Sequence, residues 1–590
     1  MPSRSALIPA ILALAVVALP FTGVLPSYSV TLFNYIGISS LVAIGLVLLT
    51  GVGGMTSFGQ AAFVGLGAYT TSVLTIHLGL SPWLALPLSL LVTALGALLI
   101  GAVTVRLSGH YLPLGTLAWG AALFYLFGNL RWLGAHDGMN GIPLVHVGSH
   151  ALIDARQYFV LVWLAVVLAV VAVQNLLDAR SGRAVRALRR NAVAAEAFGV
   201  NVASAKLKVF IFAAVLAGLA GWLYAHFQRS VSPGPFGLNA GVEYLLMAVV
   251  GGAGRVYGAI LGAAGITSLR DQVQDVLPVL IGTAGNYDIV VFGAVLVLAL
   301  QTAPNGLWPI LFGPPRPAKM PRRRPAATLS RQSVPERGRR LLEVGLVRKS
   351  YGGLVAVNDV SFEVRAGEIV GLIGPNGAGK STIFNLICGS LALDNGEIRF
   401  RDTAITGMSP QQIAARGLGR TFQHADIVAE MSVLENVALG AHLRGEAGML
   451  RAILRLDRAE DASLLEEAAR QLQRVGCTEE AYKPAGSLAL GQLRLVEVAR
   501  ALCLDPVLVL MDEPAAGLRY NEKKALARLL RELRDEGVSV LLVEHDMDFV
   551  MSLADRLIVL DFGAKIAEGA PASIRRDPRV LDAYLGGVAS

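Results

Sequence analysis

A glycine-rich loop at residues 374–382 is the feature that most restricts how this chain can fold. It fits the phosphate-loop pattern G-x-x-x-x-G-K-[ST] without a gap: Gly374-Pro375-Asn376-Gly377-Ala378-Gly379-Lys380-Ser381-Thr382. The apolar run at residues 369–373 predicts the strand that leads into such a loop, and residues 382–386 predict the helix that follows it. Because a strand, this loop and a helix occur together in α/β domains, we expect an α/β fold here.

The residue types of the loop suit the binding of phosphate. Glycines let backbone N–H groups surround a phosphate chain, and the N-terminus of the following helix favours anions. Lys380 would reach the outer phosphates, and Ser381, with Thr382 beside it, would hold phosphate and a Mg²⁺ ion. Tyr351 lies between two predicted strands, where its ring would stack on an adenine. These residues predict a site for ATP and Mg²⁺.

Further apolar runs end in residues that suit hydrolysis. The strand predicted at residues 507–511 is followed by Asp512 and Glu513, of which the first would hold Mg²⁺ and the second would act as general base. A later predicted strand brings His545 to the same edge of the sheet as a donor to the γ-phosphate. Gln423 would orient the attacking water and contact Mg²⁺.

The first half of the chain is too apolar for a soluble domain. In the whole sequence 54% of residues are hydrophobic and 16% are charged. Several apolar segments reach the length of about 20 residues that a membrane-spanning helix needs. They are 6–25, 30–50, 55–78, 83–105, 112–130, 157–177, 206–227, 242–269 and 287–312. The first lacks a convincing cleavage site, so we expect a membrane helix rather than a secretory signal.

Glycine-rich stretches interrupt this apolar half at residues 51–54 and 251–254. In a bilayer, broken helices are tolerated where they are buried or line a cavity, and they often mark the path of a solute. Close packing of helices through small residues is the alternative interpretation, and it is equally open.

Positive charge is concentrated in two places. Residues 179–208 contain Arg180, Arg183, Arg186, Arg189, Arg190, Lys206 and Lys208. Residues 313–340 contain nine Lys and Arg but a single acidic residue. Both segments are expected in the cytoplasm, and the second favours anionic lipid headgroups rather than nucleic acid. An even number of crossings must then separate them, so 242–269 is expected to enter and return as a broken hairpin, unless 271–286 crosses instead.

A further motif, Leu488-Ala489-Leu490-Gly491-Gln492, precedes a predicted helix at 493–504. The order of phosphate loop, glutamine loop, this motif, paired carboxylates, Ala516-Gly517-Leu518 and histidine resembles that of ABC ATPases. The resemblance implies a head-to-tail dimer in which each ATP lies between one subunit's phosphate loop and the signature motif of the other.

The signature motif departs from the family pattern. Ala489 and Leu490 stand where a serine and a glycine are usual, and Arg519 stands where Asp or Asn is common. The family's serine donates a hydrogen bond to the γ-phosphate, and loss of one such donor costs a few kcal/mol of transition-state stabilisation. We therefore expect the composite site that uses this signature to be weaker than its twin.

Both halves are similar to one importer family. The ATPase half resembles LivG-type subunits of branched-chain amino acid importers through residues 420–423, 512–518 and 543–547. The membrane half resembles LivM-type permeases through residues 58–69, 137–143 and 189–200. In such importers a Glu-Ala-Ala and glycine motif forms the coupling helix that docks on the ATPase. Glu196, Ala197 and Gly199 fit this motif, with a plain surface helix as the alternative.

The expected fold is an N-terminal all-α polytopic membrane domain of about eight to ten spans, some broken or re-entrant. An α/β phosphate-loop ABC ATPase domain with a helical subdomain follows it. The expected boundaries are 1–312 for the permease domain, 313–340 for a basic Pro/Arg-rich cytoplasmic linker and 341–590 for the nucleotide-binding domain.

The resemblance implies ATP-driven import of a small solute across a bacterial inner membrane. Branched-chain amino acids are the default solute, and urea, amides or aromatic acids are alternatives. The implied partners are a LivH-like permease, a LivF-like ATPase and a periplasmic solute-binding protein, with no nucleic acid. A homodimeric ABC exporter remains an alternative, because fusion of a membrane half to an ATPase half is common among exporters.

Overall fold

The computed structural model describes residues 19–22, 25–107, 111–252, 254–281, 288–303, 305–313, 327–423 and 426–585. The chain divides into two units. The helical unit comprises Met1–Leu177 and Ala203–Pro315, and the α/β unit comprises Asp178–Val202 and Arg316–Ser590. The segment Asp178–Val202 therefore packs with the α/β unit, although it interrupts the helical unit in sequence.

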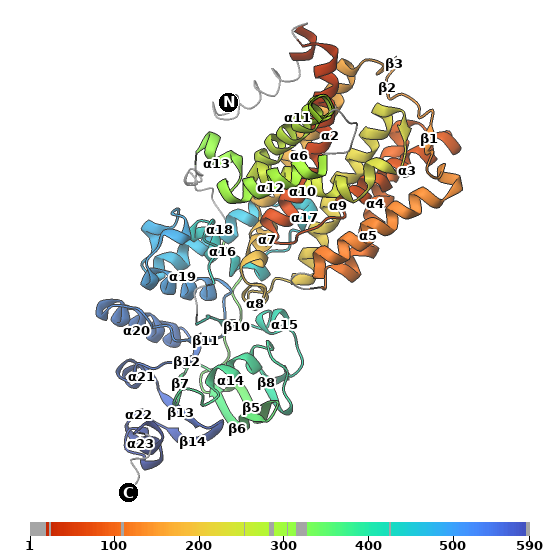
Figure 1. Ribbon diagram of the computed structural model, residues 1–590. Helices are drawn as coiled ribbons and strands as arrows, with labels where there is room; N and C mark the ends of the chain where they lie inside the picture. The colour runs from red at the N-terminus through yellow and green to blue at the C-terminus, as the bar shows by residue number, and fades with distance from the viewer. Residues whose placement is uncertain are drawn as a thin grey trace. The chain divides into compact units, whose positions relative to one another are not determined.

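The helical unit consists mainly of helices (Figure 1). They are α2 (Ser27–Leu46) with the π-helical turn η2 (Val47–Val52), α3 (Gln60–Ser72) with the π-helical turn η3 (Val73–His77), α4 (Pro82–Thr104), α5 (Tyr111–Asn129), α6 (Ala155–Leu177), α9 (Val202–Gln228), α10 (Leu238–Gly252), α11 (Val256–Ile281), α12 (Asp288–Thr302) and α13 (Leu307–Phe312). The loops contain two antiparallel pairs of two-residue strands. They are β1 (Met139–Asn140) with β4 (Ser230–Val231) and β2 (His146–Val147) with β3 (His150–Ala151).

Within the described part of the chain, five helical stretches are long and apolar enough to cross a membrane. They are Ser27–Val52, Pro82–Thr104, Tyr111–Asn129, Ala155–Leu177 and Val202–Gln228. The prediction of a helical membrane domain is thus confirmed. The predicted span 55–78 corresponds to the shorter α3, which has 13 residues. The predicted span 6–25 lies mostly outside the described residues.

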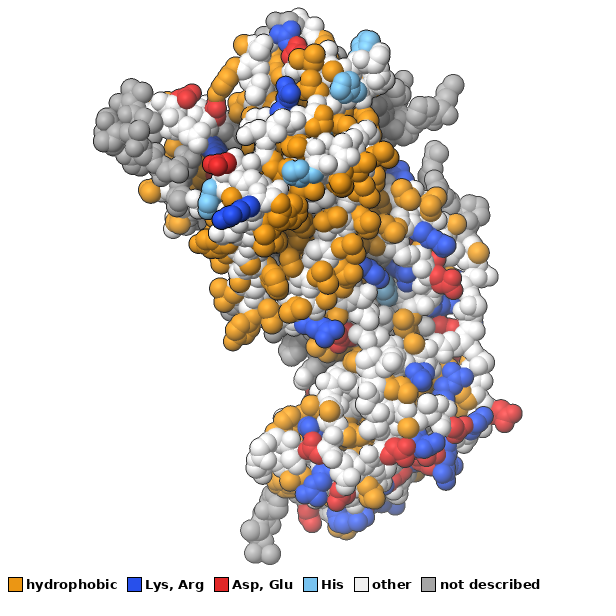
Figure 2. All heavy atoms as spheres, turned by 90° about the vertical axis from the view of Figure 1, so that its right-hand side faces the viewer, with side chains coloured by type: hydrophobic (Ala, Val, Ile, Leu, Met, Phe, Trp, Pro, Cys, Tyr) orange, Lys and Arg blue, Asp and Glu red, His pale blue; other side chains and the backbone are white. Residues whose placement is uncertain are grey.

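Helices α4 and α5 present apolar side chains on their outer surface. Only 28% and 22% of their apolar stretches are buried, against 78% for Ser27–Val52. Leu91, Leu95 and Leu99 follow one another along α4 and are each at least half exposed. Figure 2 shows hydrophobic side chains gathered over the helical unit, while charged side chains predominate over the α/β unit. This apolar surface is what helices facing lipid require.

The predicted interruption of segment 242–269 is confirmed. Helix α10 ends at Gly252, whose φ of +130° suits glycine, and α11 begins at Val256. Helix α11 then runs to Ile281, so residues 271–281 belong to it and form no separate span.

The same glycines allow α10 and α11 to approach closely. A Cβ atom on Gly251 would lie 1.9 Å from the carbonyl oxygen of Gly258, and one on Gly262 would lie 1.8 Å from that of Met247. The glycines therefore both interrupt the helix and allow close packing of α10 on α11. The sequence had left these two explanations open, and both features are present.

The basic segment between α6 and α9 forms two helices, α7 (Arg180–Arg190) and α8 (Ala192–Ala197). Helix α9 begins at Val202, so the loop predicted at residues 179–208 extends too far toward the C-terminus. Lys206 and Lys208 belong to α9, because the apolar pattern of that helix continues back past them.

The α/β unit contains a six-stranded sheet in the order β10-β11-β12-β7-β13-β14. Its strands are β7 (Ile369–Ile373), β10 (Leu418–Arg420), β11 (Leu508–Asp512), β12 (Ser539–Val543), β13 (Arg556–Asp561) and β14 (Ala564–Gly569). All neighbours are parallel except β13 and β14. β7, β11 and β12 are buried along their whole length, as the continuous apolar runs predict.

A second, antiparallel sheet has the order β6-β5-β8-β9. It comprises β5 (Arg340–Tyr351), β6 (Leu354–Arg365), β8 (Asn395–Phe400) and β9 (Thr403–Ala404). The helices of the unit are α14 (Lys380–Ile387), α15 (Pro410–Ala414), α16 (Val433–Leu439), α17 (Met449–Ile453), α18 (Arg458–Arg474), α19 (Leu490–Cys503), α20 (Tyr520–Asp535), α21 (Met547–Leu553), α22 (Pro571–Ile574) and α23 (Pro578–Leu585). Helices α16, α18 and α19 pack on one another as the helical subdomain (Figure 1).

The described part of the basic linker, residues 327–339, has no helix or strand. It packs on the α/β unit, because the backbone N–H of Gln332 donates to Asp505 Oδ2 at 2.5 Å.

We predict that Gly262→Ala destabilises the helical unit and that Gly265→Ala does not. Gly262 faces a carbonyl oxygen 1.8 Å from an added Cβ, whereas nothing lies within 4 Å of one on Gly265 in the same helix. Overpacking of this kind costs about 1–3 kcal/mol. Thermal unfolding in detergent measures the difference, and equal midpoints for the two variants would contradict the close packing of α10 and α11.

Candidate functional site

Four neighbouring parallel strands end at one edge of the large sheet, and a predicted site element follows each end. Gln423 follows β10, Asp512 and Glu513 lie at the end of β11, and His545 follows β12, while the phosphate loop follows β7. The carboxyl ends of parallel strands meet at the same edge, so segments far apart in sequence converge there.

The phosphate loop adopts a shape that needs glycine at two positions. Gly374 has φ +152°, and an added Cβ would lie 2.1 Å from the carbonyl oxygen of Leu560. Gly379 has φ +95°, and its Cβ would lie 2.4 Å from the carbonyl oxygen of Ala356. The backbone of the loop can therefore turn back on itself, as a loop that wraps a phosphate must.

Lys380 lies at the start of α14, under the loop. Its Nζ donates to the carbonyl oxygens of Gly374 and Pro375, both at 2.8 Å. Burial lowers the pKa of Lys380, while the carboxylates of Glu513 and Asp512 oppose that shift. Ser381 is exposed in the next position of the helix, where a ligand can reach its hydroxyl.

Three predicted catalytic side chains meet at one oxygen atom. Glu513 Oε1 accepts a hydrogen bond from Gln423 Nε2 at 3.1 Å and lies 2.6 Å from His545 Nε2. Glu513 has φ +49°, a left-handed conformation that is uncommon for a residue other than glycine. Its backbone N–H donates to Val543 O at 2.9 Å, which holds this conformation against the neighbouring strand.

Asp512 is buried beside this cluster, with 4% of its surface exposed. Burial raises its pKa, with the nearby Glu513 adding to the rise and Arg420 opposing it. Asp512, Ser381 and Gln423 supply oxygen atoms, the ligands that Mg²⁺ prefers. Among the described residues, no three His, Cys, Asp or Glu side chains are grouped so that they could hold a metal ion. A set of one carboxylate, one hydroxyl and one amide suits a cation that takes its remaining ligands from phosphate and water.

The signature motif lies at the start of α19 in the helical subdomain. Ala489 is the N-cap, and its backbone N–H donates to Gln492 Oε1 at 3.2 Å. The helix begins at Leu490, three residues earlier than predicted. The Leu490 side chain is 56% exposed and lies beside Gly517, where an added Cβ would be 3.0 Å from it. The hydrogen bonds of the motif join it to its own subdomain and leave this apolar side chain at the surface.

Tyr351 ends β5 and is 49% exposed. Within the described residues, no hydrogen bond or ring contact links it to the phosphate loop. Its half-exposed ring is open to a ligand, so its role with adenine stays a prediction.

Three buried charged residues on one face of α19 were missed by the sequence reasoning. Arg494, Glu497 and Arg500 are spaced by three residues and are 8%, 2% and 1% exposed. Arg494 pairs with Glu497 at 3.2 Å, and Arg500 pairs with it at 3.3 Å. Burial raises the pKa of Glu497 to about 7, although both arginines oppose the rise.

This charged row holds the segment that carries Gln423. Arg494 donates to the backbone carbonyl oxygens of Phe422, at 2.9 Å, and of Gln423. Arg500 donates to the backbone carbonyl oxygen of Asp426 at 2.7 Å. The position of the catalytic cluster therefore depends on the face of α19.

The coupling-helix motif packs against the same segment. Asn191 caps α8 and donates from Nδ2 to Asp426 Oδ2 at 2.7 Å. The Phe198 ring lies edge-on to Phe422, with centroids 6.4 Å apart, and 4.5 Å from the guanidinium of Arg500. Helix α8 is thus packed on the ATPase rather than being a free surface helix.

The predicted coupling residues take different places in this contact. Ala197 is buried in an apolar cluster with Phe198, and Glu196 is partly exposed. Gly199 has φ +84°, and an added Cβ would lie 2.1 Å from Leu443 Cγ, so only glycine fits there.

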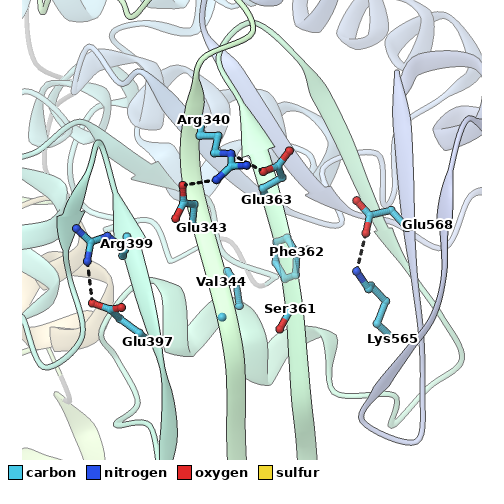
Figure 3. A pocket seen from close by; sticks show the side chains of 11 residues that line it. Arg340, Glu343, Val344, Ser361, Phe362, Glu363, Glu397, Arg399, Lys565 and Glu568 are labelled. Atoms are coloured by element: carbon cyan, nitrogen blue, oxygen red, sulfur yellow. Dashed lines mark hydrogen bonds and ion pairs between the residues drawn. The ribbon is translucent and has the colours of Figure 1, made fainter.

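A shallow pocket of about 470 Å³ lies elsewhere, over β5, β6, β8 and β14 (Figure 3). Each basic residue lining it is paired with a glutamate that also lines it: Arg340 with Glu343 and Glu363, Arg399 with Glu397, and Lys565 with Glu568. None of the predicted site residues lines this pocket, and its paired charges leave it without a free cation for phosphate.

Three family models match the chain. The model described as "Branched-chain amino acid transport system / permease component" matches residues 28–300, and "ABC transporter" matches residues 357–516. The model "Branched-chain amino acid ATP-binding cassette transporter" matches residues 564–590.

Curated relatives match the ATPase half. The high-affinity branched-chain amino acid transport ATP-binding protein LivG of Salmonella typhimurium is 43% identical over 249 residues, which are 42% of this chain and 98% of LivG. The corresponding protein BraF of Pseudomonas aeruginosa is 41% identical over 251 residues, with the same shares. A nucleotide-free ATP-binding cassette from an ABC transporter, known from its crystal structure, is 33% identical. It covers 42% of this chain and 98% of its own, with a TM-score of 0.38.

The helical membrane unit, the nucleotide site and these matches define an ABC transporter subunit in which a permease and an ATPase form one polypeptide. The ATPase half binds nucleotide and couples its hydrolysis to transport. The chain belongs to the branched-chain amino acid ABC transporter family.

We predict that Glu497→Gln destabilises the ATPase half. The substitution keeps the shape of the side chain but removes the carboxylate with which the buried Arg494 and Arg500 both pair, at a cost of about 3 kcal/mol. Glu532→Gln, on the exposed face of α20, is the matched control and should change stability by less than about 0.5 kcal/mol. Thermal unfolding of the full chain in detergent compares them, and equal midpoints would refute the structural role of the row.

Proposed function

We propose that this chain is the fused permease and ATPase subunit of an importer of branched-chain amino acids. The observation that carries the proposal is the convergence of Gln423 and His545 on one oxygen of Glu513, beside a phosphate loop. The same chain carries the permease region of the family. The relatives named for branched-chain amino acid transport support the choice of solute.

The site residues have distinct roles in this proposal. Backbone N–H groups of the loop and Lys380 hold the phosphates of ATP, and Ser381, Gln423 and Asp512 hold Mg²⁺. Glu513 accepts the proton of the attacking water, because its carboxylate is fixed at the mouth of the site.

Gln423 and His545 both contact the carboxylate of Glu513. With ATP bound, His545 would donate to the γ-phosphate. Bound MgATP supplies the phosphoanhydride bond whose hydrolysis drives the transport cycle. Closing and opening of the ATPase dimer would then reach the permease through α8, which contacts the segment that carries Gln423.

The proposed assembly contains further subunits. A LivH-like permease and a LivF-like ATPase complete the transporter, and a periplasmic binding protein delivers the solute. The permease lies in the bacterial inner membrane with the ATPase in the cytoplasm. The basic residues of α7 support that orientation.

We predict that Glu513→Gln abolishes ATP hydrolysis while leaving ATP bound. The amide cannot accept the proton of water, and loss of a general base lowers the rate by about 10²–10⁴-fold. The purified chain in lipid is assayed with its partners and with a leucine-loaded binding protein. Wild-type activity that rises with the loaded protein and vanishes in Glu513→Gln supports the importer. Activity of the lone chain that ignores every binding protein supports a homodimeric exporter instead.

We also predict that Ala489→Ser raises coupled ATPase activity. The serine restores the hydroxyl that the family's signature presents to the γ-phosphate, and one such donor is worth up to about 10²-fold in rate. Ala489→Gly, which changes the same N-cap without adding a donor, is the control. If the serine variant gives the wild-type rate at saturating ATP, the missing hydroxyl does not limit this site.

A further inference from the structure

Helix α7 presents a row of arginines to the ATPase. Arg180, Arg183 and Arg186 are three residues apart and therefore share one side of the helix. Their partners belong to the helical subdomain: Glu460 and Asp461 on α18, and Glu435 on α16.

The central pair is almost completely buried. Arg183 Nη2 lies 2.5 Å from Asp461 Oδ1, and the two side chains are 2% and 8% exposed. An isolated charge at this depth would be strongly unfavourable, so each member of the pair needs the other.

The outer pairs extend the same match. Arg186 lies 3.3 Å from Glu435, and Arg180 lies 3.8 Å from Glu460. Arg180 also donates to three backbone carbonyl oxygens of the ATPase, among them that of Ala447 at 2.8 Å. Its guanidinium group is thus recognised by shape as well as by charge.

The acidic partners are held by the ATPase itself. The Glu435 carboxylate accepts hydrogen bonds from the backbone and the hydroxyl of Ser432, both at 2.9 Å. The Glu460 carboxylate accepts from the backbone N–H of Ala447 at 3.0 Å. These contacts form a receptor that is prearranged for α7.

Such a match discriminates between partners more than it adds affinity. Burying an ion pair gains little over burying apolar groups, but burying Arg183 against a surface without an acid leaves its charge unpaired. A second ATPase domain that lacks an acid at the place of Asp461 would therefore be rejected by α7.

We propose that α7 is the recognition element by which this permease selects the ATPase domain of its own chain. The proposal rests on the proposed function, in which the assembly contains two ATPase domains. Helix α8 then docks beside it, through the contact of Asn191 with Asp426.

Reciprocal charge reversal in the full chain tests the selection. The single variants Arg183→Glu and Asp461→Arg should each lose docking, and the double variant should regain it. Arg190→Glu, at an exposed position of the same helix, is the matched control. Basal ATPase activity and thermal unfolding show whether each variant folds. Should a buried single variant fail to fold, Arg186→Glu, at a site 25% exposed, takes its place.

Docking is measured by a cross-link that needs no solute. Asn191→Cys and Asp426→Cys are introduced together to form the cross-link. The three native cysteines are buried and should not compete with this pair. A protease site is inserted between residues 313 and 326, so that cleavage separates the permease fragment from the ATPase fragment. The two fragments run as one band on a gel only where the cross-link joins them. We expect cross-linking to fall by at least about tenfold in the single variants and to return to within about twofold in the double variant.

Co-expression separates selection within one chain from docking between chains. One chain carries Arg183→Glu, the other carries Asp461→Arg, and both carry the two cysteines. If α7 docks only within its own chain, this mixture should not restore the cross-link. Restoration in this mixture, or full cross-linking in the single variants, would overturn the proposal. Loss of leucine-dependent stimulation with normal cross-linking would count against the proposed solute and leave the selection by α7 intact.

Discussion

The buried charges on one face of α19 are the interaction on which the rest of the ATPase half depends. Glu497 pairs with both Arg494 and Arg500, and these two arginines hold the backbone of the segment that carries Gln423. Gln423 in turn contacts Glu513. The position of the Glu513 carboxylate therefore depends on the buried charges of α19. A buried network of this kind is strong only when every member is paired.

The same helix links three functions along its length. Its first turn carries the signature, with Ala489 as N-cap and Leu490 exposed. Its middle holds the glutamine segment through Arg494, and its last turn meets Phe198 of the permease loop through Arg500. A helix is a rigid element, so a displacement at one end is felt at the other. The contacts therefore form a contiguous chain of residues from Phe198 to the signature motif.

The convergence of Asp512, Glu513 and His545 could be predicted from sequence because local patterns determine it. Asp512 and Glu513 follow one short apolar run and His545 follows another. Both runs form buried parallel strands, and the ends of such strands share an edge. The interruption near Gly252 was likewise visible, since consecutive glycines rarely continue a helix. In both cases the information lies within a few residues of the feature that it predicts.

The remaining parts depend on tertiary partners that a local pattern does not contain. Arginine and glutamate at three-residue spacing usually indicate a solvated helix face, yet on α19 that face is buried. The arginines of α7 were interpreted as orientation charge, and only the folded structure reveals the acids opposite three of them. The role of Tyr351 with adenine stays a prediction, because its half-exposed ring would meet a base only when nucleotide is bound.

Fusion of permease and ATPase explains why charge is placed at this contact. Two segments of one chain meet at a high effective concentration, so their contact needs little intrinsic affinity. A buried ion pair such as Arg183 with Asp461 is then well suited, since it gains little free energy when matched and costs much when mismatched. In this proposal the covalent link between the two halves brings α7 close to the ATPase, and the charges determine which ATPase surface α7 binds. In the proposed model, the positive charge of α7 would serve both the orientation of the permease in the membrane and the choice of its ATPase domain.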